Sequence, residues 1–481
     1  MDATELLTQA PGERIVTDSP RRQLVSELRG RRPGRVLVFT GRRSADANGG
    51  RRFIEQAALE AGRETVRFSD IEAEPAIGTV EKMTALIRQE KPAAVIALGG
   101  GSAMDAAKAA YLSAQSGWPL AEHFGVNRYS ERCPDAAADR VICIPTTSGT
   151  GSEATPYSNI VDPAQQVKKL IAERLIVPEL ALLVPELTNS MPETVTRATG
   201  CDALAHSIEG FLNVRADRAN PDADGWALES IRLITENLPR AIADGRDETA
   251  RRNMCIAATL GGMVIRFKPT GLPHLASYSW FGRLEHGIAV AMLLPGCWRY
   301  YLGNPSVAER TMRLAGLFPG RTPEEVIASF RRFLDSVGVP GRLSDCSGIT
   351  PELLAATAQS GPANRMKLES APRPVPAEEW LDPADLDGYR RELTRLFSGA
   401  ADAVNCFYRA GGETPKRSYE MRLVKSPQPG ENGARVFYGI EKDIAKLADI
   451  LGHSSIDTTR IYIISTGTEH RRRMENMHLI I

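Results

Sequence analysis

The sequence lacks long apolar runs, a charge imbalance and paired cysteines, three features that mark large classes of protein. No stretch reaches the roughly 18 consecutive apolar residues that a membrane-spanning helix requires, and the first residues lack the cationic start and apolar core of a secretory signal. Lysine plus arginine equals aspartate plus glutamate, 59 against 59, so the overall charge indicates neither a nucleic-acid nor an anionic membrane partner. We therefore expect a cytoplasmic protein that acts on a small molecule.

Cysteine is scarce, with 7 residues in 481, and no two of them form a Cys-x-x-Cys pair. Scattered cysteines in odd number indicate buried thiols of a reducing compartment and argue against a disulfide framework. A chain of this length can bury a large core without covalent cross-links, and its length alone predicts about two or three domains.

Short apolar segments alternate with helical ones through the first part of the chain. The expected strands are residues 35–40, 64–71, 93–101 and 139–147, and the expected helices include 53–61 and 79–90. This alternation predicts a Rossmann-like α/β domain, in which a parallel sheet carries helices on both faces. After about residue 195, long amphipathic segments such as 223–245 and 248–267 predict an all-α domain.

These changes of pattern predict three parts. Residues 1–195 form a nucleotide-binding α/β domain, residues 196–400 form a helical metal-binding catalytic domain, and residues 401–481 form a linker with a small appended helical tail. The linker is predicted because the chain there is polar and rich in glycine and proline. We expect the cleft between the first two domains to hold the chemistry.

Two polar loops, each following an expected strand, suggest a phosphate site. The first comprises Gly99, Gly100, Gly101 and Ser102. Glycines let the backbone approach a pyrophosphate, and the first amide groups of the following helix favour the anion. The second loop contains Thr146 and Thr147, whose hydroxyls can bond phosphate or ribose. Each loop alone is equally explained by a tight turn or a helix cap, but two in one parallel-sheet domain favour nucleotide binding.

A carboxylate and three histidines offer a set of metal ligands. Asp202 and His206 are four residues apart and share one face of a helix, and His274 and His286 precede an apolar stretch. One carboxylate and three neutral imidazoles can hold Fe²⁺ or Zn²⁺ and leave a position open for a substrate oxygen. From the spacing alone, histidines with structural roles remain the alternative.

The segments GGGSAMDAAK, IPTTSGTGSE and TGCDALAHSIE, followed by the two later histidines, together resemble the iron-dependent (group III) alcohol dehydrogenase family over roughly residues 15–395. The resemblance implies that the chain interconverts a small alcohol and its aldehyde with NADH or NADPH, and that it forms a homodimer. The metal ligands that it implies are Asp202, His206, His274 and His286. The cofactor residues that it implies are Gly99, Gly100, Gly101, Ser102, Thr146 and Thr147, with Asp105 and Lys169 on the cofactor side.

The end of the first expected strand bears on the choice of cofactor. It reads Thr40-Gly41-Arg42-Arg43, and many relatives carry an acidic residue in place of Gly41. An acid there would repel the 2′-phosphate of NADPH. Since it is absent and two arginines follow, we hypothesise that NADPH is used.

Four cations close to the motifs raise a more specific possibility for the substrate. They are Lys168, Arg266, Lys268 and Arg283. Such residues could receive an anionic aldehyde, for example phosphonoacetaldehyde, although solvated surface charges are the alternative interpretation.

The last 45 or so residues differ from the rest. Residues 446–462 resemble the end of a tyrosine recombinase (phage integrase), with His453 and Tyr462 at the positions of that family's histidine and nucleophilic tyrosine. Such chemistry also needs an arginine box upstream to neutralise the reacting phosphate, but here the His-x-x-Arg box at 470–473 follows Tyr462. We interpret the tail as an inactive fragment with at most weak, salt-sensitive affinity for DNA. A DNA-binding protein is the alternative from another functional class, and nucleic acid is not the expected partner.

Overall fold

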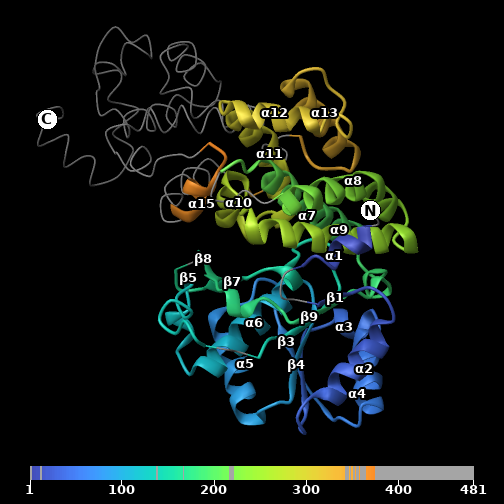
Figure 1. Cartoon of the computed structure of the whole chain (residues 1–481), viewed down its shortest axis with the longest axis vertical. Coiled ribbons are helices and arrows are strands. Elements are labelled where there is room, and N and C mark those ends of the chain that lie inside the picture. The colour runs from blue at the N-terminus through green and yellow to red at the C-terminus, as the bar shows by residue number, and fades with distance from the viewer. Residues whose placement is uncertain are drawn as a thin grey trace, which may run out of the picture. The chain divides into compact units, whose positions relative to one another are not determined.

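The computed structural model describes residues 3–373, with gaps at 11–13, 137–138, 166 and 216–220 and over most of 342–364. Within these residues, strands and helices alternate in the first half of the chain, and the second half is helical (Figure 1). The predicted linker and tail, residues 401–481, lie outside the described residues.

The main sheet of the first half has six parallel strands. In spatial order they are β1 (Arg14–Val16), β9 (Leu180–Leu182), β6 (Ile142–Pro145), β4 (Ala94–Gly99), β2 (Val36–Gly41) and β3 (Thr65–Ile71). The central strands β4 and β6 are buried at every position. A strand covered on both faces has no solvent side, which explains why these segments read as continuous apolar runs and not as an alternation.

Helices cover both faces of this sheet, as the sequence predicted (Figure 1). One face carries α2 (Pro20–Gly30) and α4 (Gly50–Glu60), and the other carries α5 (Ile77–Glu90) and α6 (Gly101–Ser116). Successive side chains of a strand point to opposite faces, and β2 follows this rule. Val36 and Val38 pack in the core beneath α2 and α4, whereas Leu37 and Phe39 pack beneath α5 and α6.

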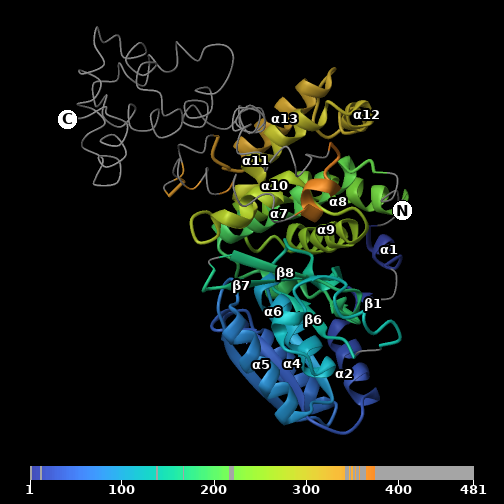
Figure 2. The same cartoon turned by 90° about the vertical axis from the view of Figure 1, so that its left-hand side faces the viewer.

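A second sheet of three strands was not predicted. It consists of β5 (Gly125–Val126), β8 (Val167–Ala172) and β7 (Tyr157–Asp162), with β7 and β8 antiparallel. In Figures 1 and 2, β7 and β8 lie between α5 and α6 on one side and the helical half on the other. The short helices of the first half are α1 (Ala3–Leu7), α3 (Ser44–Ala47), η1 (Leu120–Glu122), η2 (Ser152–Ala154), η3 (Arg174–Ile176) and η4 (Pro185–Thr188).

The second half is helical, which confirms the predicted all-α character. Its elements are α7 (Glu193–Leu212), α8 (Pro221–Ala243), α9 (Glu248–Phe267), α10 (Leu272–Ser277), η6 (Tyr278–Trp280), α11 (His286–Tyr301), α12 (Pro305–Arg313), α13 (Pro323–Ser336) and α15 (Arg365–Ser370). The start of α9 is fixed by Asp247, whose side chain accepts a hydrogen bond from the Ala250 amide. Across the residues that are described, no helix has both the length and the apolar character needed to cross a membrane.

The two halves touch through the loop that follows β6. Gly151 packs against Gly262 of α9 so closely that a Cβ on Gly262 would lie 2.4 Å from the Gly151 carbonyl oxygen. Beside this contact, the buried Glu153 accepts a hydrogen bond of 2.7 Å from the Thr259 hydroxyl of α9. The loop with the predicted nucleotide hydroxyls therefore abuts the helical half directly.

Candidate active site

A cavity of about 360 Å³ lies between the two halves of the chain. Its walls include Gly101 and Ser102 from the start of α6, and Asp202, His274 and His286 from the helical half. The carboxyl end of β4 delivers the glycine turn to this place, which is the edge of a parallel sheet where ligands generally bind. The structure thus brings one predicted phosphate loop and the predicted metal ligands to the same cavity.

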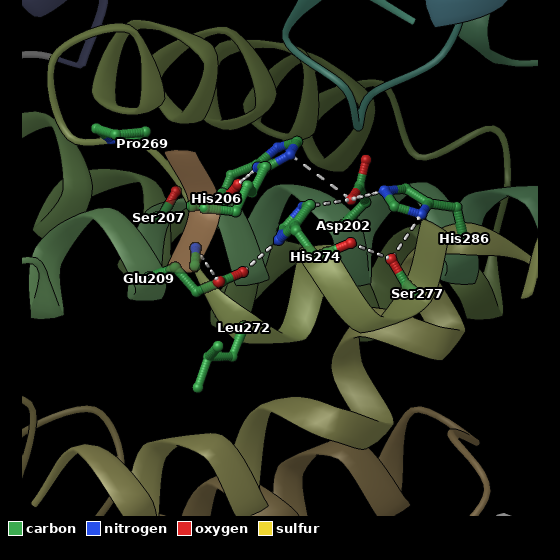
Figure 3. A network of polar contacts seen from close by, with 12 residues as sticks. Asp202, His206, Ser207, Glu209, Pro269, Leu272, His274, Ser277 and His286 are labelled. Atoms are coloured by element: carbon green, nitrogen blue, oxygen red, sulfur yellow. Dashed lines mark hydrogen bonds and ion pairs between the residues drawn. The ribbon is translucent and has the colours of Figure 1, made fainter. Parts of the chain in front are cut away.

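The four predicted ligands come from three helices (Figure 3). Asp202 and His206 lie one turn apart on α7, His274 lies on α10, and His286 is the first residue of α11. The Asp202 Oδ1 atom is 3.7 Å from Nε2 of His206, 3.4 Å from Nε2 of His274 and 3.6 Å from Nε2 of His286. Asp202, His274 and His286 each offer a ligand atom within 4.8 Å of the other two, and the His206 ring stacks on His274 with 4.7 Å between centroids.

Within the part of the chain that the structure describes, two polar atoms at the centre of this cluster make no hydrogen bond. They are Asp202 Oδ1 and His274 Nε2, and both are buried. Because buried polar atoms almost always have a partner, this arrangement fits a cation among the four side chains. The donor set, one carboxylate and three imidazoles, suits Fe²⁺ or Zn²⁺.

Three of the four side chains also have protonation states that suit a metal. Burial lowers the pKa of His206 to about 4 and lowers the pKa of His286 well below its ordinary value. Burial would raise the pKa of Asp202, but the imidazoles of His206, His286 and His274 hold it below its usual range. At neutral pH, Asp202 is therefore ionised and His206 and His286 are neutral, which are the forms that bind metals. For the fourth, His274, burial would lower the pKa, but the carboxylates of Glu209 and Asp202 raise it above its ordinary value.

Two residues behind the cluster were missed by sequence reasoning. Glu209 of α7 accepts hydrogen bonds from the His274 Nδ1 atom and, at 2.8 Å, from the Gly271 amide. Ser277 of α10 lies with its Oγ 3.2 Å from the Nδ1 of His286. Glu209 could have been found, because it follows His206 by three positions and so shares its helix face.

Lys367 of α15 also lines the cavity and was not anticipated. Burial lowers the pKa of Lys367 to about 8, despite the neighbouring carboxylates of Glu209 and Asp202. No spacing in the sequence links it to the motifs, since it comes from a helix far along the chain.

The two predicted phosphate loops pack on each other. The Thr146 amide donates a 2.9 Å hydrogen bond to the Gly99 carbonyl. A Cβ on Gly100 would lie 3.0 Å from the Thr147 hydroxyl, and one on Gly101 would lie 2.7 Å from Cγ2 of Thr150. Side chains at these two glycines would force the loops apart, so the close approach requires glycine.

Asp105 lies in the cavity wall with both carboxylate oxygens engaged. Oδ1 accepts a 2.6 Å hydrogen bond from the Ser152 hydroxyl, and Oδ2 accepts one of 2.9 Å from the Asn159 amide. The buried Lys108 ammonium lies 3.6 Å away. Burial raises the pKa of Asp105 and lowers that of Lys108. Asp105 therefore ties α6 to the loop and to β7 at the edge of the cavity.

The structure places Lys169 away from the cavity lining. Its Nζ lies 2.7 Å from Asp162 Oδ2, whereas the preceding residue, Lys168, does line the cavity and lies 2.8 Å from Glu74 Oε2. Neighbouring residues of a strand face opposite ways, which separates the two lysines. Of the other cations near the motifs, Lys268 is buried and pairs with Asp224.

Gly41 lies at the carboxyl end of β2. Because Thr40 pairs with Leu98, Gly41 is next to Gly99 along the same edge of the sheet. Arg42, which follows it, is exposed and lies 2.6 Å from Asp70.

Residues 401–481 lie outside the described residues and beyond the family matches given next. The likeness of His453 and Tyr462 to a tyrosine recombinase therefore stays a prediction.

Comparisons with known proteins bear on the rest of the chain. The model for iron-containing alcohol dehydrogenases matches residues 11–185, and the model for the C-terminal part of the Fe-containing alcohol dehydrogenase family matches residues 196–381. A NAD-dependent methanol dehydrogenase from Bacillus methanolicus is 33% identical over 58% of this chain and 74% of its own length. A long-chain-alcohol dehydrogenase from Geobacillus thermodenitrificans is 33% identical over 64% of this chain and 78% of its own.

Solved structures agree with these matches. An iron-containing alcohol dehydrogenase from Thermotoga maritima is similar over 80% of this chain and 98% of its own, with 27% identity and a TM-score of 0.66. A 1,3-propanediol oxidoreductase is similar over 79% of this chain and 98% of its own, with 26% identity and a TM-score of 0.69. On the two family matches and the identity to curated relatives, this chain belongs to the iron-containing alcohol dehydrogenase family.

Proposed function

We propose that this chain is a metal-dependent, NAD(P)-linked alcohol dehydrogenase that interconverts a small primary alcohol and its aldehyde. The observation that carries the proposal is the cavity whose walls hold both the glycine turn and the Asp-His cluster. Hydride transfer requires the carbon of the cofactor and the carbon of the substrate to be in contact. A cofactor turn and a metal cluster facing one cavity meet that requirement.

In the proposed reaction, Asp202, His206, His274 and His286 hold one divalent metal. The metal supplies Lewis acidity toward the substrate oxygen, and the nicotinamide supplies or accepts the hydride. The chain itself orients the reactants and excludes water from the metal centre. Asp202, His206 and His274 are at most 5% exposed, so few waters compete with the substrate. The amides at the start of α6 orient the cofactor's pyrophosphate.

The test compares two buried histidines. The full-length chain is freed of metal with a chelator, reloaded with Fe²⁺ or Zn²⁺, and assayed for aldehyde-dependent oxidation of NADH and NADPH. We expect His274→Ala to lose bound metal and turnover together. His123→Ala is the matched control, since His123 is equally buried but is not among the residues that line the cavity, and it should keep both. Full metal content and turnover in His274→Ala would refute the proposal.

For the cofactor we propose a preference for NADPH. The support is the absence of an acid at Gly41 and the presence of Arg42 and Arg43 beside the glycine turn. Replacing both arginines by alanine should lower kcat/KM with NADPH much more than with NADH. Arg51→Ala removes an exposed arginine from α4 and serves as the control. An equal loss with both cofactors would contradict the preference.

A second candidate function is reduction of an anionic aldehyde such as phosphonoacetaldehyde. It is favoured by two lysines in the cavity wall, Lys168 and Lys367. Two cations in a partly desolvated cavity would hold an anionic group while the carbonyl faces the histidines. Lys168→Met should then raise KM for phosphonoacetaldehyde and leave KM for propanal unchanged. The same change for both aldehydes would favour the neutral substrate.

Four further expectations from the sequence stand as proposals. The domain boundaries are proposed at 195 and 400, and the first is supported by the change from strands to helices between η4 and α7. A cytoplasmic location is supported by the free thiols of all six described cysteines.

A homodimer is testable by light scattering. For the tail we propose no strand transfer, which a covalent adduct between Tyr462 and DNA would overturn.

A further inference from the structure

We infer that Glu209 is a positioning residue for the metal centre, because it holds His274 in the tautomer that presents Nε2 to the metal. The inference rests on the proposed function. Glu209 is buried behind His274, on the side opposite Asp202 (Figure 3). It is therefore placed to act on the ligand without touching the metal, the cofactor or the substrate.

The hydrogen bonds of Glu209 determine which nitrogen of His274 carries the proton. An ionised carboxylate can only accept hydrogen bonds. Its Oε2 contacts Nδ1 of His274, so that nitrogen must be the donor. In the neutral ring the lone pair then lies on Nε2, which is the atom 3.4 Å from Asp202 Oδ1.

Ser277 determines in the same way which nitrogen of His286 carries the proton. Its hydroxyl has one proton, and it donates that proton to the His274 carbonyl over 2.8 Å. Toward His286 Nδ1, at 3.2 Å, the hydroxyl can then only accept. His286 consequently carries its proton on Nδ1 and turns the Nε2 lone pair toward Asp202.

Glutamine cannot replace Glu209 in this arrangement. The two oxygens of Glu209 accept from two N–H groups, because Oε1 also accepts a 2.8 Å hydrogen bond from the Gly271 amide. Glutamine has only one acceptor oxygen. The backbone amide of Gly271 cannot change its role, so the oxygen must stay there and the glutamine NH₂ must face His274. His274 then becomes the acceptor at Nδ1, and its proton moves to Nε2, where it blocks the metal.

The test measures metal affinity and tautomer in the full-length chain. Metal-free protein is titrated with Co²⁺ in competition with a chelator, and we expect Glu209→Gln to bind roughly 10 to 100-fold more weakly than the unmodified chain. Nitrogen-15 shifts of the histidine rings, recorded on the metal-free protein at a pH at which the His274 ring is neutral, should show the His274 proton on Nδ1 in the unmodified chain and on Nε2 in Glu209→Gln.

Ser207→Ala is the matched control. Ser207 lies on the same helix, two residues before Glu209, and its buried hydroxyl bonds the Ala203 carbonyl at 3.0 Å and the Ser230 hydroxyl at 2.7 Å. The variant loses buried hydrogen bonds, but the two partners of its hydroxyl are not proposed metal ligands, so its Co²⁺ affinity and its histidine tautomers should be unchanged.

The outcomes separate this inference from the proposed function. Unchanged affinity and an unchanged tautomer in Glu209→Gln would overturn the inference. If Glu209→Gln does not fold, the ring shifts of the unmodified metal-free chain decide, and a His274 proton on Nε2 instead of Nδ1 would overturn the inference. An unmodified chain that takes up no metal would instead refute the proposed function, while the ring shifts would still decide the tautomer.

Discussion

The buried histidines of this chain differ in what lies behind them. His274 has a carboxylate at its Nδ1, whereas His123, which is 2% exposed, has its Nε2 3.0 Å from the Ser116 hydroxyl and no hydrogen-bond partner at Nδ1. Burial lowers the pKa of His123 to about 4, and the carboxylates of Glu173 and Glu122 do not offset it. The fold therefore accepts His123 only in its neutral form.

This difference predicts how stability depends on pH. The folded-state pKa of His123 is depressed, so its contribution is fully present above the unfolded-state pKa of about 6.5. That contribution is lost as the pH falls toward the folded-state pKa of about 4, because the unfolded chain takes up a proton that the folded chain refuses. Between pH 7 and pH 5, His123 should cost about 2 kcal/mol of unfolding free energy.

Urea unfolding at the two pH values measures this loss. His123→Phe replaces the ring by one that cannot be protonated and can still stack on Trp118, whose ring lies 5.7 Å away. The variant should lose about 2 kcal/mol less than the unmodified chain on going from pH 7 to pH 5. If the free energy of unfolding falls by the same amount in the two proteins, His123 does not titrate as described.

Sequence reasoning at the residue level found the side chains that carry motifs, but not their partners. Asp202 and His206 were visible through their helical spacing. The spacing also puts Glu209 on the helix face of His206, but it does not show that a histidine from another helix packs against Glu209. Lys168 and Lys169 illustrate the same limit, since only the structure shows which face of β8 is turned to the cavity and therefore which lysine lines it.

Among the elements, the contact between α11 and α7 positions the fourth ligand. A Cβ on Gly287 would lie 1.8 Å from the Ala198 carbonyl oxygen and 2.9 Å from the Asp202 Cβ. The first turn of α11 therefore rests directly on α7 beside Asp202. This close approach brings His286, the residue before Gly287, to within 3.6 Å of the carboxylate.

Gly287→Ala should push α11 away from α7. Overpacking of this kind costs about 1 to 3 kcal/mol of stability, and the displaced His286 should weaken Co²⁺ binding. Thermal unfolding and a Co²⁺ titration measure the two effects.

Gly225→Ala is the control for this substitution. Gly225 lies inside α8, where a Cβ would meet nothing within 4 Å, so alanine should stabilise the helix by about 0.5 to 1 kcal/mol and leave Co²⁺ binding unchanged. Wild-type metal affinity in Gly287→Ala would mean that the helix contact does not position His286.

Four of the six strands of the main sheet, β2, β3, β4 and β6, correspond to segments expected from the sequence. Burial on both faces makes β2, β4 and β6 apolar runs that stand out in the sequence. β1 and β9 have three residues each and were not predicted. The amphipathic segments 223–245 and 248–267 correspond to α8 and α9. The second sheet could not be predicted. Its β8 reads VKKLIA and is only partly buried, and its β5 has two residues, so neither gives a clear strand pattern.

For the molecule as a whole, a bound ion would join helices that are separate along the chain. Its proposed ligands come from α7, α10 and α11, and the unfolded chain does not bring them together. A ligand that binds only the folded state stabilises it, by about 2.7 kcal/mol at a free concentration 100 times the Kd.

We therefore expect metal to raise the thermal midpoint of the full-length chain by a few degrees, and a chelator to reverse the rise. Differential scanning calorimetry with and without Zn²⁺ measures the shift. Asp202→Asn replaces the shared carboxylate by a neutral amide, so the metal should raise its thermal midpoint much less. An identical shift in both proteins would place the stabilising ion elsewhere.

Because the proposed ligands come from three helices, the supply of metal to the cell should also affect how much of this enzyme is present. Proteases act mainly on chains that have opened, and molecules without their ion open more often. A cell starved of the metal would therefore hold fewer copies of the enzyme as well as less active ones, and its capacity to reduce aldehydes would fall faster than occupancy of the centre alone predicts.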